Sequence, residues 1–334
     1  MTVSVQLDAE DRVVPALTFE RTVARHLVHR RALSEVFLTD SQVFDGSSFV
    51  AGAQLPSSHA YFTDHSTPHA VDPLLLLECC RQAETHAVHA HFGADPTTKF
   101  VLESWDAELP GLTRIPPSRG PADLVIEAQT SRSHRAGEVL RAMDYRMHLS
   151  LSGSPLGKVT MRVKYVSEGV YRALRRRPDG VLPTSDDYRG ALDQSGLVDP
   201  RRVGRRRAEN VVLLEPTVAG RDVRARLRVA GGHPSLFDHA QDHLPGMVLM
   251  EAGRQAALLA AEELDQVRAD QLTVIRFSAS FHAYSELDRP VTVVARRPED
   301  EKVRSGDTID VLVTFEQAGR TVAETVYGAV RHDA

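Results

Sequence analysis

Two short stretches of the chain place a carboxylate, a guanidinium and an amide at helical spacing. Both contain the pattern Glu-x-x-Arg-Gln-Ala after an Asp-His pair: "FDHAQDHLPGMVLMEAGRQAA" (237–257) and "TDHSTPHAVDPLLLLECCRQAE" (63–84). Residues three and four apart in a helix lie on one face, so these side chains would share the same surroundings. A carboxylate can move a proton, and a guanidinium can hold a phosphate through two parallel hydrogen bonds. The pattern predicts acid–base chemistry beside an anionic group.

The two stretches are copies of one another at a constant spacing. Three pairs of residues lie 173 positions apart: Glu78 and Glu251, Arg81 and Arg254, Gln82 and Gln255. Upstream, Asp64-His65 matches Asp238-His239 with one residue of slippage, and downstream "KFVLESWDA" (99–107) falls on "LTVIRFSAS" (272–280). Because three landmarks keep their order, the sequence indicates an internal duplication.

Each copy predicts a long buried helix. In the first copy, Asp72 is a suitable N-cap, Pro73 fits the first helical turn, and an apolar run continues from Leu74. Gly93 is a natural stop for this helix, and the second helix is expected to begin near Gly246. Because nearly every residue between these ends is apolar or small, both helices should be buried.

Strand-like segments follow each helix. They are 99–107, 122–130, 139–151 and 156–166 in the first copy, and 272–284, 291–297, 308–317 and 321–330 in the second. In 139–151 apolar and polar residues alternate, with Met143, Tyr145, Met147 and Leu149 on one face, as is typical of a half-buried antiparallel strand. A long central helix wrapped by an antiparallel sheet, present twice, predicts an α+β tandem double hotdog.

The predicted domains are 1–167 and 210–334, each forming one hotdog. Between them, residues 168–209 are rich in Arg, Pro, Gly and Asp and contain "RRRPDG" and "RRVGRRR". This composition is typical of an exposed linker. An alternative role for its arginines is the docking of an acidic carrier protein.

Composition and the N-terminus restrict the class of protein. The net charge of −5 in 334 residues argues against a nucleic-acid or membrane-surface partner. The N-terminal residues are acidic where a secretion signal is basic, and no apolar run reaches the roughly 20 residues of a membrane span. Cys79 and Cys80 are adjacent and unsuited to a disulfide with each other, which fits a reducing compartment. We expect a soluble cytoplasmic protein.

Four segments resemble the A-factor synthase (AfsA-type) family: "VHRRALSEVFLTD" (28–40), "GAQLPSSHAYF" (52–62), "DPLLLLECCRQ" (72–82) and "HPSLFDHAQDHLPGMVLMEAGRQAA" (233–257). The resemblance implies two hotdog domains and an acyltransferase activity. In that family a β-ketoacyl group passes from an acyl carrier protein to the hydroxyl of dihydroxyacetone phosphate. The products are precursors of γ-butyrolactone, butenolide and furan signalling molecules. We expect no cofactor.

The segment "HLPGMVLMEAGRQ" (243–255) also looks like the central-helix motif of hydroxyacyl-carrier-protein dehydratases. Gly246 and Glu251 keep the spacing of that motif, but Arg254 stands where dehydratases usually have an apolar residue. A dehydratase or thioesterase is therefore the nearest alternative, although it leaves Arg81 and Arg254 unexplained. A non-catalytic acyl-binding module is the second alternative.

Attack of an alcohol on a thioester requires a base, donors for the developing oxyanion and cations for the phosphate. Glu78 and Glu251 are the predicted catalytic carboxylates, since burial would raise the pKa of each toward a useful range. The alternative is that each carboxylate only pairs with the arginine three residues on. Arg81 and Arg254 are predicted to bind the phosphate. The other predicted substrate contacts are Gln82, Gln255, His65 and His243.

The two copies differ at the amino end of the helix. Gly246 can offer a free backbone N–H there, whereas its counterpart Pro73 has none to donate. If the copies pair as hotdogs do in dehydratases, the two sites consist of His239, Gly246 and Glu78, and of His65, Pro73 and Glu251. The first is predicted to be the working site, with His239 orienting Glu78 or the hydroxyl.

Two other groups receive structural interpretations. The histidines at positions 86, 89 and 91 are poorly spaced for one helix face, so we predict no metal site. Cys79 and Cys80 have Ala252 and Gly253 as counterparts, which favours packing over an acyl-cysteine intermediate. Because one chain already contains a pair of hotdogs, whether it forms a homodimer stays open.

Overall fold

The computed structural model describes residues 16–67, 70–116, 119–137, 139–177, 180–190, 195–298 and 308–331. By their contacts these residues form two compact units. Unit 1 comprises the chain segments 1–57, 75–103 and 107–175, and unit 2 comprises 58–74, 104–106 and 176–334. The loop that precedes the first long helix therefore belongs to unit 2, although it comes from the first half of the sequence.

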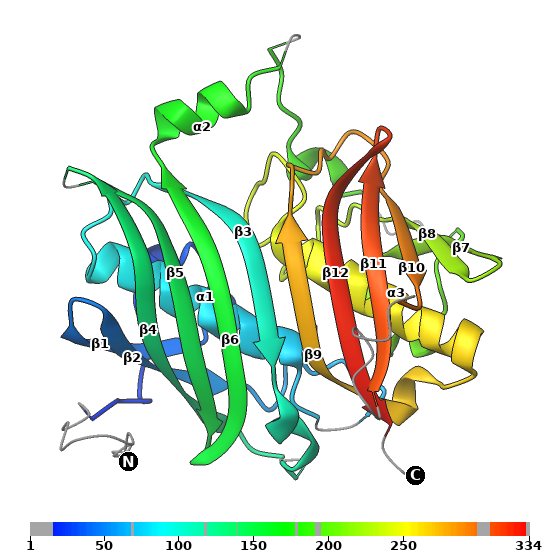
Figure 1. Ribbon diagram of the computed structural model, residues 1–334, viewed down its shortest axis with the longest axis horizontal. Coiled ribbons are helices and arrows are strands. Elements are labelled where there is room, and N and C mark those ends of the chain that lie inside the picture. The colour runs from blue at the N-terminus through cyan, green and yellow to red at the C-terminus, as the bar shows by residue number, and fades with distance from the viewer. Residues whose placement is uncertain are drawn as a thin grey trace. The chain divides into compact units, whose positions relative to one another are not determined.

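Unit 1 consists of one long helix against an antiparallel sheet (Figure 1). The helix is α1 (Pro73–Ala90), whose first two residues group with unit 2. The strands follow the order β1-β2-β4-β5-β6-β3. Their bounds are β1 Leu38–Asp45, β2 Ser48–Leu55, β3 Lys99–Glu108, β4 Ala122–Ala136, β5 Val139–Leu151 and β6 Ser154–Val166. The predicted helix and the four strands predicted after it are confirmed.

The alternation predicted for residues 139–151 is present in β5. Its buried residues include Met143, Tyr145, Met147 and Leu149, while the residues at 146 and 148 are exposed. From this face a hydrogen-bonded chain runs from Tyr145 to Tyr165 and on to Glu84 of α1, with 2.7 Å between the oxygens at each step. The apolar face of the sheet thus packs on the helix, and one buried carboxylate lies between them.

Unit 2 repeats this plan around α3 (Gly246–Asp265). Its strands follow the order β9-β12-β11-β10-β8-β7 (Figure 1). Their bounds are β7 Leu213–Ala219, β8 Asp222–Leu227, β9 Leu272–Phe281, β10 Thr292–Arg296, β11 Thr308–Gln317 and β12 Arg320–Arg331. Every residue of α3 from Val248 to Ala261 is buried. Gly253 allows this close packing, because a Cβ atom there would lie 2.8 Å from the ring of Tyr327 on β12.

Each central helix is preceded by a β-hairpin that the sequence did not predict. The hairpins are β1–β2 and β7–β8, and they add two strands to the plan of a helix followed by strands. β1 contains the polar run "TDSQ" and is only partly buried, while β7 contains Pro216 and the left-handed Glu215 (φ 52°). Neither strand alternates regularly, and β7 ends the strand order of unit 2, where proline is tolerated.

The segment 168–209 is more than an exposed linker. Its described part contains α2 (Glu168–Leu174), η4 (Ser185–Tyr188), η5 (Pro200–Val203) and the start of η6 (Ala208–Asn210), while 178–179 and 191–194 lie outside the described residues. Arg205, in the run "RRVGRRR", has no exposed surface. The linker prediction is therefore wrong for this part of the segment. The predicted domains 1–167 and 210–334 also differ from the contact units, because 58–74 and 176–209 group with unit 2.

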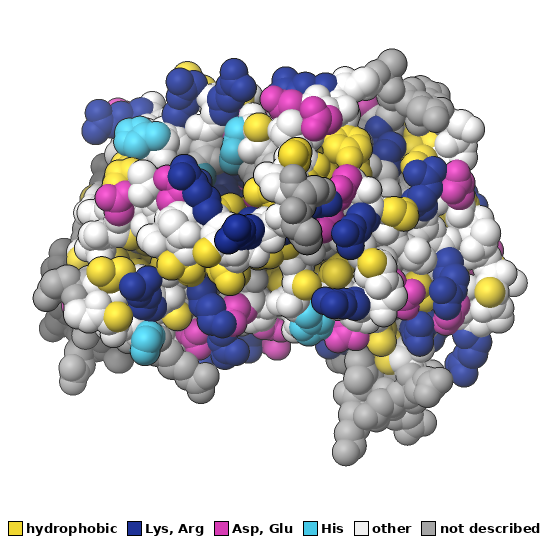
Figure 2. Space-filling model, turned by 90° about the horizontal axis from the view of Figure 1, so that it is seen from above, with side chains coloured by type: hydrophobic (Ala, Val, Ile, Leu, Met, Phe, Trp, Pro, Cys, Tyr) yellow, Lys and Arg dark blue, Asp and Glu magenta, His cyan; other side chains and the backbone are white. Residues whose placement is uncertain are grey.

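Charged side chains of both signs lie on the face of the molecule that Figure 2 shows. Figure 2 shows Lys and Arg side chains with Asp and Glu among them rather than one continuous basic field, which accords with the net charge of −5. None of the helices in the described ranges has both the length and the apolar character needed to span a membrane.

Candidate functional site

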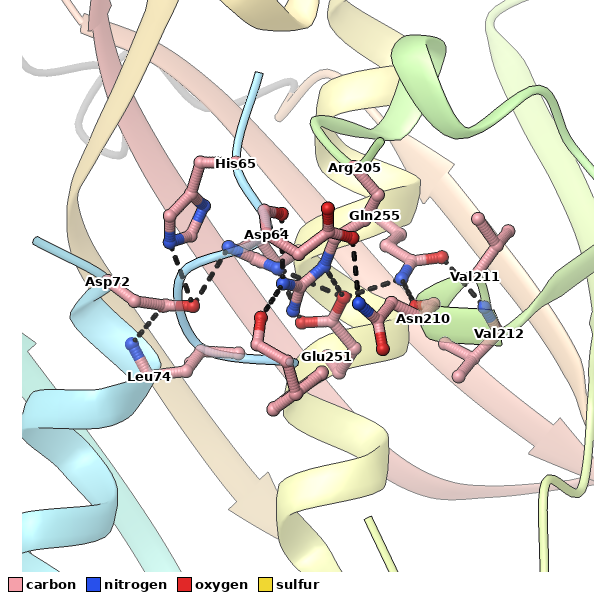
Figure 3. A network of polar contacts seen from close by, with 12 residues as sticks. Asp64, His65, Asp72, Leu74, Arg205, Asn210, Val211, Val212, Glu251 and Gln255 are labelled. Atoms are coloured by element: carbon pink, nitrogen blue, oxygen red, sulfur yellow. Dashed lines mark hydrogen bonds and ion pairs between the residues drawn. The ribbon is translucent and has the colours of Figure 1, made fainter. Parts of the chain in front are cut away.

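Glu251 lies at the centre of a buried polar network in unit 2 (Figure 3). Its Oε1 accepts a hydrogen bond from Arg205 Nε at 2.9 Å, and its Oε2 accepts one from Arg254 Nη2 at 2.7 Å. The amide of Gln255 donates to Oε1 as well. The three motif residues of α3 thus meet on one face as their spacing predicts, together with a second arginine from the segment after η5.

Glu78 has the same surroundings in unit 1. Arg30 Nη2 lies 2.6 Å from Glu78 Oε1, and Arg81 donates to both carboxylate oxygens at 2.8 Å. Gln82 donates to Oε1 at 2.6 Å. We call the set Arg30, Glu78 and Arg81 cluster 1, and the set Arg205, Glu251 and Arg254 cluster 2.

Arg30 and Arg205 are the cluster residues that the sequence reasoning missed. Each of them lies between two 3-10 helices. Arg30 lies between η1 (Arg25–Val28) and η2 (Leu33–Glu35) in unit 1. Arg205 lies between η5 and η6 in unit 2. The segments "VHRRALSE" (28–35) and "VGRRRAEN" (203–210) align without a gap. A comparison of these segments extends the duplication upstream and brings both arginines into it.

The pKa of each cluster carboxylate is lowered, contrary to the prediction. Burial by itself raises the pKa of Glu78 and Glu251, but attraction and hydrogen bonds from two arginines outweigh it and lower the pKa of both to about 2. Each carboxylate is therefore ionised and already paired at neutral pH, and it is a weak proton acceptor. The expectation of a raised pKa is wrong, and the alternative of an ion pair within the helix describes the geometry.

Gln82 and Gln255 connect the clusters to backbone outside the central helices α1 and α3. In each amide the oxygen accepts from a backbone N–H and the nitrogen donates to a backbone carbonyl as well as to the cluster carboxylate. The backbone partners are Phe37 N and Glu35 O for Gln82, and Val212 N and Asn210 O for Gln255. Because both amide hydrogens are used, the structure favours a positioning role over the substrate contact predicted for these glutamines.

The clusters differ in their access to solvent. In cluster 1 the side chains of Arg30 and Arg81 are 12% and 18% exposed, whereas Arg205 and Arg254 in cluster 2 are 0% and 5% exposed. Arg205 lies over the ring of Tyr61 at 4.3 Å and donates to the carbonyl of Tyr61 at 2.6 Å. Tyr61 thus covers cluster 2 through a cation–π contact.

His65 and Asp72 come from the first copy and lie beside cluster 2 in unit 2 (Figure 3). His65 Nε2 lies 2.8 Å from the carbonyl of Phe62 and 3.3 Å from Asp72 Oδ2. The same Asp72 oxygen lies 3.6 Å from Arg254 Nη1. Burial lowers the pKa of His65 to about 4 although Asp72 opposes the shift, so the imidazole is neutral at pH 7. The loop that contains His65 in the first copy is therefore next to cluster 2, which contains Glu251 of the second copy, as predicted for the second site.

The two Asp-His pairs near α3 each form a contact within the pair. His239 Nδ1 lies 3.2 Å from Asp238 Oδ2, and its Nε2 lies 2.6 Å from the amide nitrogen of Gln241. His243 Nδ1 contacts Asp242 in the same way. An aspartate on Nδ1 orients the imidazole ring. With its side chain 40% exposed, His239 is the more accessible partner of the pair with Asp238.

The amino ends of the two central helices differ as predicted from Gly246 and Pro73. At α1, Asp72 Oδ1 accepts a hydrogen bond from the backbone N–H of Leu74 at 2.8 Å. At α3, the N-cap residue is Pro245, which makes no side-chain hydrogen bond to the helix. Within the described part of the chain, no partner is recorded for the N–H of Gly246. The start of α3 is thus open to an acceptor and the start of α1 is capped.

The composition of the predicted working site remains a prediction. Glu78 belongs to unit 1, whereas His239 and Gly246 belong to unit 2.

The packing role predicted for the buried cysteines is supported, since burial raises the pKa of the Cys79 and Cys80 thiols and leaves little thiolate.

Comparison with known proteins identifies relatives over most of the chain. A family model described as the A-factor biosynthesis hotdog domain matches residues 14–167 and 189–330. A 2-oxo-3-(phosphooxy)propyl 3-oxoalkanoate synthase of Streptomyces virginiae is 36% identical over 314 residues, covering 92% of this chain and 97% of the relative. The synthase of the same name from Streptomyces griseus is 31% identical over 335 residues, covering 97% of this chain and 99% of the relative.

Solved structures with little sequence similarity share the fold. The pyran synthase domain from module nine of the sorangicin pathway has a TM-score of 0.53 at 13% identity, covering 91% of this chain and all of that domain (100%). A putative thioesterase from Novosphingobium aromaticivorans has a TM-score of 0.51 at 12% identity, covering 88% of this chain and 98% of that one. Together with the family model, these neighbours confirm the predicted double hotdog.

Proposed function

The chain belongs to the A-factor biosynthesis hotdog family, and we propose on that premise that it transfers a β-ketoacyl group to the hydroxyl of dihydroxyacetone phosphate. The observation that carries this proposal is identity of 31–36% to two synthases over nearly their whole length. Their name describes a phosphorylated three-carbon ketone esterified to a 3-oxo acid. Such an ester forms when the triose hydroxyl attacks an acyl thioester.

The donor in this proposal is a β-ketoacyl thioester of an acyl carrier protein. The hydroxyl oxygen forms a bond to the thioester carbonyl carbon, the carbon–sulfur bond breaks, and the released thiolate takes up a proton. A coenzyme A thioester carries the same reactive group, so the two donors are compared directly. Rates with β-ketoacyl carrier protein and β-ketoacyl coenzyme A at equal concentration distinguish them, and faster transfer from coenzyme A would contradict the proposed donor.

Cluster 1 is the proposed phosphate-binding element. Two guanidiniums around one carboxylate leave a net charge of +1, and both arginines are partly exposed. A planar guanidinium recognises phosphate oxygens through paired hydrogen bonds. Glu78, with its pKa lowered to about 2, holds the two arginines in place and is not the proton acceptor that the sequence suggested.

His239 is the proposed proton acceptor, because Asp238 orients its imidazole and its Nε2, among the described residues, contacts only the side-chain amide of Gln241. The open N–H of Gly246 is the proposed donor to the thioester oxygen as negative charge develops there. Cluster 2 is the proposed structural counterpart of cluster 1, because its arginines are nearly inaccessible.

One assay tests the reaction against its alternatives. The protein is incubated with a β-ketoacyl carrier protein, with and without dihydroxyacetone phosphate, and the products are identified by mass. The phosphorylated ester, formed only with the triose, is the expected product. Free acid or an enoyl thioester without the triose would instead indicate a thioesterase or dehydratase, and an unchanged thioester would indicate an acyl-binding module.

A further inference from the structure

A pocket of about 860 Å³ lies within unit 2. Its walls come from η4, η6, the strands β7 and β8, the residues that follow β8, and the loop 287–291 before β10. Its volume is in the range of roughly 300–1,000 Å³ that is usual for small-molecule sites. None of its lining residues belongs to cluster 1 or cluster 2.

Backbone packing fixes the position of one wall of the pocket, which is formed by the residues after Ser185. A Cβ atom on Gly231 would lie 2.0 Å from the carbonyl oxygen of Ser185, so only glycine lets η4 approach this closely. Ser185 is fully buried, and its N–H donates to the carbonyl of Gln241 at 2.8 Å. The residues that follow Ser185 and line the pocket are therefore anchored to the rest of unit 2 by packing and by a backbone hydrogen bond.

Much of the pocket lining is apolar. The apolar residues include Leu214, Leu227, Val229, Leu244, Leu287 and Val291. A wall of this kind binds an apolar chain by removing it from water. The lining therefore favours a ligand with an aliphatic portion.

Arg228 provides a cation in this lining. Its Nε donates to the carbonyl of Val211 at 2.8 Å, and one Nη donates to the carbonyls of Glu209 and Val211. No carboxylate among the described residues pairs with it, and its other Nη has no recorded partner there. Burial lowers its pKa to about 10, so it remains charged at pH 7. A half-buried guanidinium held only by carbonyls retains most of its attraction for an anion.

The other charged groups in the lining are more exposed or already paired. Arg226 pairs with Glu215 at 3.0 Å, Arg189 with Asp186 at 2.8 Å, and Asp288 with Arg177 at 2.7 Å. The remaining charged lining residues, Asp187, Glu209 and Arg289, are exposed to solvent. Arg228 is thus the partly buried charge that a ligand would meet.

We propose that this pocket binds a single-chain aliphatic molecule with an anionic head group, the head on Arg228 and the chain along the apolar wall. The proposal does not depend on the acyl-transfer reaction, since none of the residues proposed for that reaction lines the pocket. His233, which also lines the pocket, is neutral at pH 7 because burial and the nearby charges of Arg205 and Arg228 lower its pKa to about 4. It therefore adds no charge of its own.

Calorimetric titration of the full chain with decyl phosphate tests this site. Decyl phosphate is expected to bind at least roughly tenfold more tightly than decanol or inorganic phosphate, because each of these lacks one half of the interaction. Arg228→Gln should weaken binding by roughly tenfold to a hundredfold, and Arg228→Lys, which keeps the charge, should weaken it less. Arg224→Gln is the matched control, since Arg224 lies on β8 outside the lining and pairs with Asp222.

A second variant keeps the test valid where Arg228→Gln fails to fold. Val229→Trp fills the pocket without removing a charge and should abolish binding of decyl phosphate. Equal affinity for decanol and decyl phosphate would overturn the role of Arg228. Binding that survives Val229→Trp but is lost in Arg81→Lys would overturn the site itself and place the ligand at cluster 1. Acyl transfer is measured in a separate assay. If the protein proves not to transfer acyl groups, the binding results for decyl phosphate can still be interpreted.

Discussion

Cluster 1 and cluster 2 contain the same groups at equivalent positions but differ in how far water reaches them. Each has a glutamate bound by two arginines and by a glutamine that is tied to backbone. In cluster 2, Tyr61 lies over Arg205, and Arg205 has no exposed surface. In cluster 1 the equivalent arginine, Arg30, is 12% exposed. The same groups are therefore present in both copies, but only the arginines of cluster 1 are exposed enough for us to expect contact with a ligand.

The start of the central helix shows a second difference between the copies. In α1 the side chain of Asp72 satisfies a backbone N–H and the first residue is a proline, whereas α3 begins with Gly246 and lacks a side-chain cap. An uncapped helix start carries partial positive charge and free donors. From these two differences we expect an anion to contact cluster 1 rather than cluster 2, and the start of α3 rather than the start of α1.

The largest effect is expected for Arg205→Ala. The variant leaves Glu251 buried with one arginine in place of two, which should lower the free energy of unfolding by about 3–5 kcal/mol. The matched change Arg30→Ala should lower it by only about 1–2 kcal/mol, since water reaches that cluster. Urea unfolding measures both values, and equal losses would show that exposure does not separate the clusters.

Next in size is the effect of removing the N–H at the start of α3. Gly246→Pro should lower kcat by roughly 10²–10³-fold, the usual effect of losing one oxyanion donor. Pro73→Gly should leave kcat almost unchanged, because Asp72 caps that helix. Proline suits a first helical turn, and Pro245 already has the extended conformation (φ −60°, ψ 149°) that a following proline requires.

Circular dichroism and thermal melting serve as controls for this pair, because a misfolded Gly246→Pro variant would say nothing about the donor. A folded variant with normal turnover would remove Gly246 from the proposed mechanism. Loss of turnover in Pro73→Gly alone would mean that the working site is the other one.

A smaller effect is expected from replacing the forked guanidiniums. Arg81→Lys should raise the KM for dihydroxyacetone phosphate by roughly tenfold while the KM for the thioester stays the same, because one charged hydrogen bond to phosphate is lost. Arg254→Lys should leave both KM values unchanged and lower the melting temperature instead. Steady-state kinetics with each substrate varied separately check this. Similar increases in the KM for the triose in both variants would mean that cluster 2 also meets the phosphate.

The smallest effect concerns Glu84, which has Ala257 as its counterpart in the second copy. Burial raises the pKa of Glu84 to about 7, although hydrogen bonds from Tyr165 and Thr85 oppose the shift. A raised pKa means that its contribution to stability is complete below about pH 4.5 and is lost as the pH rises through about 7. Glu84→Gln should therefore gain about 1–2 kcal/mol relative to the unchanged protein between pH 5.5 and pH 8.

The measurement is the difference in unfolding free energy between variant and unchanged protein at the two pH values. Taking this difference removes the contributions of the buried histidines, which titrate over the same range in both proteins. A difference that does not vary with pH would show that Glu84 is ionised throughout.

The sequence by itself determined the duplication, the two central helices and the strands that follow them. These depend on local rules: a proline in the first turn at Pro73, a continuous apolar run, and alternation in residues 139–151. Helical spacing alone also predicts that Glu251, Arg254 and Gln255 lie on one face of their helix.

Only the tertiary structure decided the charge state of the motif. Arg30 lies 48 positions from Glu78, and Arg205 lies 46 positions from Glu251, so no local spacing joins them. Together with Arg81 and Arg254, they outweigh the effect of burial and lower the pKa of each carboxylate, because the energy of a buried charge depends on all the partners that the fold brings to it. The hairpins before each helix were likewise hidden, since β1 and β7 gain their order from pairing with neighbouring strands and not from a regular pattern of their own.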